Sequence, residues 1–204
     1  MQSNRQWLLA AMLLPIPAAL LIARFFFFQP FDSPSASMEP SINQRDYFLV
    51  SLRAFAAEGP ERGDVIVFRT SRGDFVKRVA GIPGDHVRMV HGQLVLNGKP
   101  VPRRRVEDFA DRGEAGVNAV RQYVETLPSG RSYRVLDIMD NGPADDTDDT
   151  VVPPDAYFVL GDNRDNSDDS RLDVGFVHRA DLVGRVTMKF FDGRRGAPVW
   201  APVN

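Results

Sequence analysis

The chain has 204 residues, of which 43% are hydrophobic and 25% charged, so it can fold as one domain and also carry a targeting segment. Its 25 basic and 27 acidic side chains give a net charge of −2, which creates no field that would concentrate nucleic acid, and we expect no nucleic-acid partner. The lack of cysteine excludes disulfides, thiolate catalysis and thiolate metal sites.

Residues 7–28 are an apolar run of Leu, Ala, Ile, Met and Phe, interrupted by Pro15, Pro17 and Arg24. As a helix this run would span roughly 33 Å, about the thickness of a hydrocarbon core. A cleaved signal peptide is the competing interpretation, but the run is longer than the usual apolar core of such a peptide and ends in bulky Phe. We therefore expect an uncleaved transmembrane anchor at 7–28, a short tail at 1–6, and residues 29–204 on the outer face.

The chain after the anchor has the pattern of a mainly β protein. Short runs of β-branched and aromatic residues alternate with turns rich in glycine, and His91-Gly92 and Asn97-Gly98 are typical of hairpin turns. Only the segment from Asn118 to Thr126 has a weak helical period. We expect strands at 47–52, 65–69, 75–80, 86–90, 93–96, 132–137, 157–160 and 183–190.

Residues 103–150 differ from their flanks, since they begin with three arginines, end in an acidic cluster and carry fewer apolar side chains. We interpret this segment as a second, smaller β lobe inserted into a core made of residues 29–102 and 151–204. The arginines could bind anionic lipid, but three charges are few, and a solvated loop is the preferred interpretation.

Three segments carry polar residues that a β core does not need. The first is Ser35-Ala36-Ser37-Met38, which could equally be a plain linker after the anchor. The second holds Lys77 inside a strand, where alternation puts it on the same face as Phe75 and Val79. A lysine with apolar neighbours has a lowered pKa and can act as a base, although a lysine that blunts a sheet edge is the plainer alternative.

The third segment runs from Gly161 to Arg171 and is dense in Asp, Asn, Ser and Arg, as expected of a loop fixed by its own hydrogen bonds. An EF-hand is discounted, because the spacing lacks the required glycine and distal glutamate. No G-x-S-x-G or H-E-x-x-H motif occurs, and the three histidines have no motif around them. Serine and lysine remain as the available nucleophile and base, a pair that can attack a peptide bond without histidine.

Together these segments resemble the sequence boxes of the bacterial type I signal peptidases, which are membrane-anchored Ser-Lys endopeptidases. The resemblance runs from about residue 28 to 190, and Gly161 to Arg171 matches the most distinctive signature of that family. It implies that Ser37 is the nucleophile and Lys77 the general base. It also implies that the Ser35 hydroxyl and the Ser37 N–H form the oxyanion hole.

Further roles follow from the same resemblance. Ser167 would orient Lys77, and Asp169 with Arg171 would form a supporting ion pair behind the site. The candidate walls of the substrate pocket are Pro34, Met38, Ile42, Phe75 and Val76. Ser33 departs from the family pattern, which has at this position an apolar residue that helps line the substrate pocket.

The resemblance implies a serine endopeptidase that cuts signal peptides from exported preproteins after A-x-A-like sites, without metal or cofactor. Its partners would be those signal peptides and the lipid bilayer, and it would sit as a single-pass protein in the bacterial cytoplasmic membrane with its catalytic domain outside. One alternative is a peptidase of the same family dedicated to a single pilin or conjugation substrate. Others are a repressor-type autoprotease, against which the membrane run argues, and a non-catalytic membrane-anchored β module that binds peptides.

Overall fold

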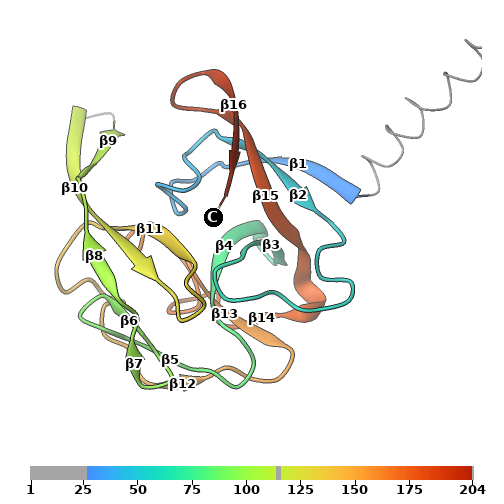
Figure 1. Cartoon of the computed structure of the whole chain (residues 1–204), viewed down its shortest axis with the longest axis vertical. Coiled ribbons are helices and arrows are strands. Elements are labelled where there is room, and N and C mark those ends of the chain that lie inside the picture. The colour runs from blue at the N-terminus through green and yellow to red at the C-terminus, as the bar shows by residue number, and fades with distance from the viewer. Residues whose placement is uncertain (1–26, 114–115, 204) are drawn as a thin grey trace, which may run out of the picture.

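The computed structural model describes residues 27–113 and 116–203, and within them the fold is almost entirely β (Figure 1). The expected anchor at 7–28 lies outside the described residues except for its last two positions, and Phe28 already begins the first strand. Within the described part of the chain, no helix is long and apolar enough to cross a membrane.

The largest sheet has eight strands in the order β1-β2-β15-β3-β4-β13-β14, with β16 paired to β15. These strands come from distant parts of the chain, so the sheet is held together by long-range pairing. Their bounds are β1 Phe28–Asp32, β2 Tyr47–Ser51, β3 Val65–Thr70, β4 Gly73–Gly81, β13 Ala156–Leu160, β14 Val177–His178, β15 Leu182–Asp192 and β16 Ala197–Pro202. A short 3-10 turn, Arg179–Asp181, joins β14 to β15.

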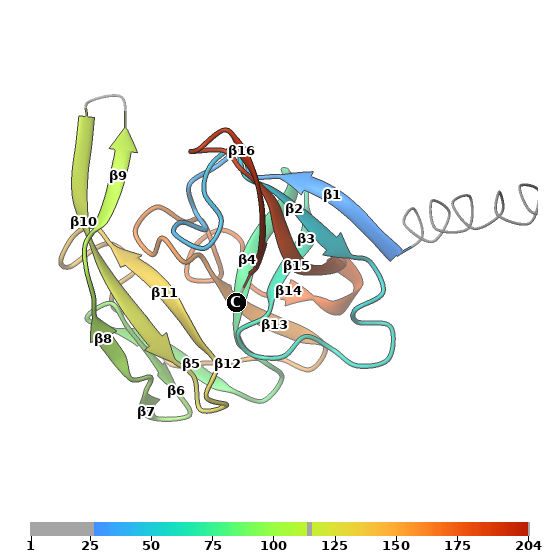
Figure 2. The ribbon, with the colours of Figure 1, turned by 45° about the horizontal axis from the view of Figure 1, so that its top comes forward.

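Two four-stranded sheets are built from the middle of the chain and lie to the left in Figure 1. One has the order β12-β5-β6-β7, and the other has β11-β10-β8 with β9 paired to β10. Their bounds are β5 His86–Val90, β6 Gln93–Leu96, β7 Lys99–Pro100, β8 Arg103–Arg105, β9 Phe109–Gly113, β10 Gly116–Thr126, β11 Ser132–Asp137 and β12 Thr150–Val151. Figure 2 shows the β9–β10 hairpin projecting as an arm beyond both sheets.

The sequence located most of the central strands to within one or two residues, and the β5–β6 hairpin across His91-Gly92 is confirmed. Both His91 and Gly92 have positive φ, as their turn requires. The weak helical period at Asn118–Thr126 was wrong, since this segment lies in β10. Strands pair on both of its edges, so tertiary pairing overrides the helical signal.

The first four residues of β3 are all buried, and its two faces pack into different parts of the core. Val65 and Val67 pack with Phe48, Val50 and Val186 on one face, whereas the other face packs Ile66 and Phe68 against β13. A third cluster fills the space between β13 and the two smaller sheets, with residues Val87, Met89, Leu94, Tyr133, Val135, Phe158 and Leu160 among its members. The expected boundary of an inserted lobe at 103–150 stays a prediction.

A buried ion pair joins the β8–β11 sheet to the loop after β13. Arg164 donates to Glu125 on β10 at 2.5 Å, and their side chains are 4% and 0% exposed. Tyr133 on β11 donates to the same Glu125 oxygen at 3.1 Å. Burial works against the charged Arg164, but Glu125 outweighs it and keeps the pKa of the guanidinium raised.

Glu125→Ala should lower the free energy of unfolding by about 3–5 kcal/mol, because it leaves the Arg164 charge buried without its partner. Urea denaturation measures this loss. The matched control is Glu107→Ala, which breaks the exposed pair with Arg134 and should change the free energy of unfolding far less, since solvent screens this pair. Equal losses in the two variants would contradict the prediction.

Candidate active site

Ser37 and Lys77, which are 40 positions apart in the chain, meet in the structure. The Lys77 Nζ donates a hydrogen bond to Ser37 Oγ over 2.7 Å, and the two residues are only 4% and 8% exposed. Lys77 lies on β4, and Ser37 lies in the loop between β1 and β2. The amine also sits over the Phe75 ring, 5.4 Å from its centroid, as the predicted alternation along β4 requires.

Burial lowers the pKa of Lys77 from 10.5 to about 8, because the charged ammonium loses its hydration. The negative charges of Asp169, Asp168 and Asp162 act in the opposite direction and limit the shift. About a tenth of Lys77 is therefore a neutral amine at pH 7 and about half at pH 8, and a neutral amine can accept the proton of the serine hydroxyl.

The loop that carries Ser37 is held at both ends. The Ser33 carbonyl accepts from Arg45 N at 2.7 Å, and Ser33 N donates to the Asp46 carbonyl at 3.0 Å. Asp46 is fully buried and its carboxylate accepts from Lys189 Nζ at 2.9 Å and from Gly193 N at 2.8 Å. These contacts fix the loop against β15 and against the turn that follows it.

Ser33 and Ser35 support the same loop. Ser33 is buried, and its hydroxyl donates to the Ser35 carbonyl at 3.0 Å, so the polarity of Ser33 is satisfied inside the loop. The hydroxyls of Ser35 and Ser37 are 3.2 Å apart. Among the described residues, the backbone N–H of Ser37 has no hydrogen-bond acceptor.

The Gly161–Arg171 loop packs directly against the nucleophile segment. Asn163 N donates to the Ser37 carbonyl at 3.1 Å, and its Nδ2 donates to the Ala36 carbonyl at 3.2 Å. Asp162 accepts two bonds of 2.7 Å from Arg78, the neighbour of Lys77. Sequence analysis singled out the loop but missed Asn163 and Asp162, since one chain cannot show which of its many polar residues turn toward Ser37.

Asp169 and Arg171 form a fully buried bidentate ion pair, with bonds of 2.9 Å and 2.8 Å. Burial alone would raise the pKa of Asp169, but the guanidinium and the Gly161 N–H outweigh it and hold the pKa low. Ser167 lies close enough to Asp169 to contribute to this lowering. Its hydroxyl nevertheless makes no hydrogen bond of ordinary geometry to Lys77 or to any other described residue.

The residues predicted to line the substrate pocket separate into two groups. Met38 and Ile42 are 1% and 0% exposed and belong to the core with Phe48 and Val50, because the loop folds back onto the sheet. They support the site from below and cannot form an open wall. Pro34, Phe75 and Val76 keep some exposure and remain candidates.

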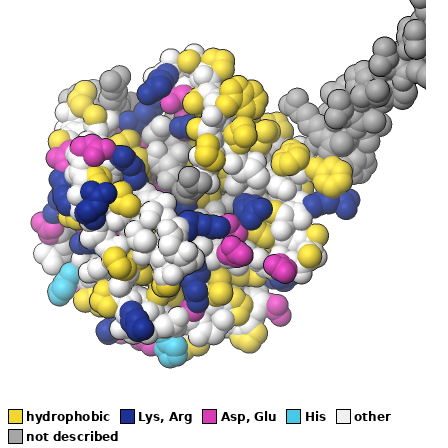
Figure 3. Space-filling view, in the orientation of Figure 1, with side chains coloured by type: hydrophobic (Ala, Val, Ile, Leu, Met, Phe, Trp, Pro, Cys, Tyr) yellow, Lys and Arg dark blue, Asp and Glu magenta, His cyan; other side chains and the backbone are white. Residues whose placement is uncertain are grey.

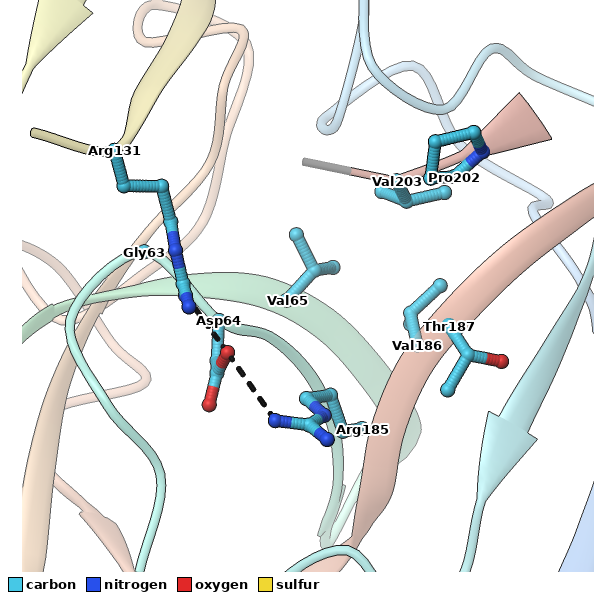
Figure 4. A pocket seen from close by; sticks show the side chains of 9 residues that line it. All are labelled: Gly63, Asp64, Val65, Arg131, Arg185, Val186, Thr187, Pro202 and Val203. Carbon is cyan, nitrogen blue, oxygen red and sulfur yellow. Dashed lines mark hydrogen bonds and ion pairs between the residues drawn. The ribbon is translucent and has the colours of Figure 1, made fainter.

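A hollow of about 280 Å³ lies elsewhere, between β3, β15 and residues 202 and 203. Neither Ser37 nor Lys77 lines it. Figure 4 shows the Asp64 carboxylate between Arg131 and Arg185, at 2.8 Å and 3.8 Å. Since two arginines already neutralise this carboxylate, we interpret the charged side chains that line the hollow as a structural ion cluster.

Gly161→Ala should displace Ser37, because a Cβ at this position would lie 2.6 Å from the Ser37 carbonyl oxygen and 2.2 Å from Ser167 Oγ. We expect a loss of about 1–3 kcal/mol in urea denaturation and, in a crystal structure of the variant, a longer distance between Ser37 Oγ and Lys77 Nζ. Gly98→Ala is the control, since its added Cβ meets no atom within 4 Å and strains only a remote turn with positive φ. An unchanged distance in Gly161→Ala would be the contrary result.

Comparison with known proteins shows which family this chain resembles. The model of the family described as signal peptidase, peptidase S26, matches residues 5–191. The signal peptidase I of Rickettsia typhi is 32% identical over 201 residues, covering 84% of this chain and 75% of the relative, and that of Rickettsia prowazekii is 33% identical with the same coverage. A solved signal peptidase I from Enterococcus faecalis V583 is 30% identical and covers 64% of this chain and 98% of its own, but its TM-score of 0.38 carries no conclusion about the fold. The chain belongs to the signal peptidase family, peptidase S26, and is a serine endopeptidase of that family.

Proposed function

We propose that this chain removes signal peptides from exported preproteins with Ser37 as nucleophile and Lys77 as general base. The observation that carries the proposal is the hydrogen bond of 2.7 Å between the buried Lys77 amine and the Ser37 hydroxyl. A lysine pKa of about 8 supports it, since a base must be unprotonated to act.

In the proposed reaction, neutral Lys77 takes the hydroxyl proton while Ser37 Oγ attacks the carbonyl carbon before the cut. The negative oxygen that forms accepts hydrogen bonds from the Ser37 N–H and the Ser35 hydroxyl, and one such donor typically contributes about 3 kcal/mol to lowering the barrier. Lys77 then gives its proton to the leaving amine of the mature protein. A water molecule, deprotonated by Lys77 in turn, hydrolyses the acyl-enzyme and releases the signal peptide.

The second part of the proposal concerns the groups around the dyad. Asp169 and Arg171 keep the loop rigid through their buried ion pair, without contacting the substrate. The role of Ser167 in orienting Lys77 rests on the family resemblance. Its position within reach of both Gly161 and Asp169 agrees with such a role.

The substrate is proposed to bind in extended form between the Ser37 loop and β4. From Gly73 to Lys77, β4 is paired with β3 on one edge only, and β13 pairs with it from Arg78 onward. This free edge, within the described strands, offers main-chain donors and acceptors to a peptide strand. Pro34, Phe75 and Val76 are the proposed walls for small side chains at the first and third positions before the cut, which gives the A-x-A preference.

Membrane attachment is proposed through the apolar segment at 7–28, with the catalytic part, 29–204, outside the cytoplasmic membrane. Exposed aromatic residues support contact of this face with a membrane surface. Phe28, Tyr47 and Trp200 are 42%, 45% and 73% exposed, and Figure 3 shows hydrophobic side chains gathered over β1 and β16, on the side where the described chain begins. Aromatic side chains of this kind suit a membrane interface.

Ser37→Ala should lower kcat/KM for a preprotein by more than about 10³-fold, and Lys77→Met by about 10² to 10⁴-fold. The double variant should be no slower than the slower single variant, because the two residues act as a unit. Cleavage of a purified preprotein followed on gels measures these rates, with Lys99→Met as the matched control for loss of an exposed lysine. Full activity in either single variant would refute the proposal.

Loss of activity in Lys77→Met should not come from unfolding. The lowered pKa means that the fold disfavours the charged lysine by about 3 kcal/mol below pH 8, a cost that fades as pH rises from about 8 toward 10.5. The methionine variant should therefore unfold at a urea concentration no lower than the parent protein at pH 7. A clear drop would mean that the activity data alone do not identify Lys77 as the base.

Activity should rise about tenfold per pH unit below pH 8 and level off above it, because only unprotonated Lys77 can act as base. Asp168→Asn should move the midpoint to lower pH, since the Asp168 charge raises the pKa of Lys77. The measurement is kcat/KM between pH 6 and 10 for both proteins. A flat profile from pH 6 to 9 would argue against a neutral lysine base.

A further inference from the structure

A second hollow borders the nucleophile loop on the side away from β4. Its volume is about 460 Å³, and none of its lining residues comes from β4. It includes Ala36, directly before the nucleophile, and Asn163, which donates to the Ala36 carbonyl. The buried Oδ1 of Asn163 has no partner among the described residues.

The position of the hollow relative to the dyad assigns it to one end of the substrate. This step rests on the proposed function, in which the residues before the cut lie along the free edge of β4. In that arrangement, a chain that passes Ser37 and leaves β4 would continue along the Ala36 and Asn163 side, where this hollow lies.

The charged residues that line the hollow are partly neutralised by each other. Arg194 pairs with Glu39 at 3.0 Å and with Asp111 at 3.7 Å. It also donates to the Ala110 carbonyl at 3.0 Å and stacks on Phe109, with 4.4 Å between the guanidinium carbon and the ring centroid. Arg194 thus connects the nucleophile loop to the β9–β10 arm, which rises beside the blue loop in Figure 2, and forms a fixed wall.

Arg45 is the remaining cation of the lining, and it is exposed, with no ion-pair or hydrogen-bond partner for its side chain among the described residues. Its backbone has φ of +67°, a conformation that bulky side chains rarely adopt. The Gly193 backbone packs so closely on Arg45 that a Cβ there would lie 2.4 Å from the Arg45 carbonyl carbon and oxygen. Its surroundings maintain this strained backbone in the same loop that carries Ser37, which indicates a position under functional constraint.

We propose that this hollow binds the first residues of the mature protein and that Arg45 selects an acidic side chain among them. The guanidinium would pair with the carboxylate of Asp or Glu, a charge-assisted bond that a neutral residue cannot make. A lysine at the same position would be disfavoured by repulsion. Arg45 would act as a specificity residue in substrate binding and take no part in bond breaking.

The test uses peptides with Ala at the first and third positions before the cut and with Glu, Gln or Lys placed at each of the first three positions after it. At one of these three positions, the parent protein should cleave the Glu peptide with a kcat/KM about fivefold above the Gln peptide, as expected for an accessible ion pair. The ratio should fall toward one in about 1 M salt, where the Debye length is about 3 Å. No preference at any of the three positions would overturn the proposal.

Arg45→Asn should reduce the Glu-to-Gln ratio to about one. Asparagine is chosen because it tolerates positive φ better than most side chains, so the loop can keep its conformation. Arg45→Lys should keep most of the preference, and Arg45→Glu should reverse it in favour of the Lys peptide. Arg88→Asn, which removes an exposed arginine from β5 in another sheet, is the control and should leave the ratio unchanged.

An unchanged ratio in Arg45→Asn would overturn the proposal. Failure of this inference is distinct from failure of the proposed function. If Ser37→Ala still cleaved the Gln peptide, the dyad itself would be wrong. If Ser37→Ala is inactive and only the Arg45 ratios are unaffected, the selection of acidic residues alone is refuted.

Discussion

The geometry of the candidate active site depends on excluding water from the Lys77 amine beside the Ser37 hydroxyl. Lys77 loses its hydration under the Ser37 loop and against Phe75, which is why its pKa falls. Three aspartates near the amine oppose this fall, and each is paired with an arginine. Asp169 pairs with Arg171 at 2.8 Å, Asp168 with Arg72 at 2.5 Å, and Asp162 with Arg78 at 2.7 Å. The arginines neutralise carboxylates that would otherwise hold the lysine charged.

The Gly161–Arg171 loop joins the eight-stranded sheet to the β8–β11 sheet. Leu136 at the end of β11 pairs with Asn163 through main-chain bonds on either side, while Asn163 donates to the Ser37 carbonyl. Arg164 reaches into the β8–β11 sheet and meets Glu125. The smaller sheet thereby positions the loop that supports the nucleophile, so its packing and the geometry of the dyad are coupled.

The nucleophile loop separates two surfaces with different chemistry. On one side, the free edge of β4 offers main-chain groups and partly apolar side chains, which suits recognition of shape and size. On the other side, the hollow at Arg45 and Arg194 is polar and charged, which suits recognition of side-chain charge. Both kinds of recognition suit an enzyme that cuts between an apolar signal peptide and a polar mature chain.

The sequence by itself determined the β character, most central strands and the β5–β6 hairpin, because these depend on local alternation and turn residues. It also singled out the three polar segments that the structure brings together around Ser37 and Lys77. Local patterns could not determine which partners β10 finds, and its weak helical period gave a wrong prediction for that reason. They also could not show that Met38 and Ile42 turn into the core, that Asn163 supports Ser37, or that the Arg45 side chain lines a hollow and has no partner among the residues that the structure describes. Only the tertiary structure decided these points, since burial and ion pairing depend on residues far apart in the chain being brought into contact.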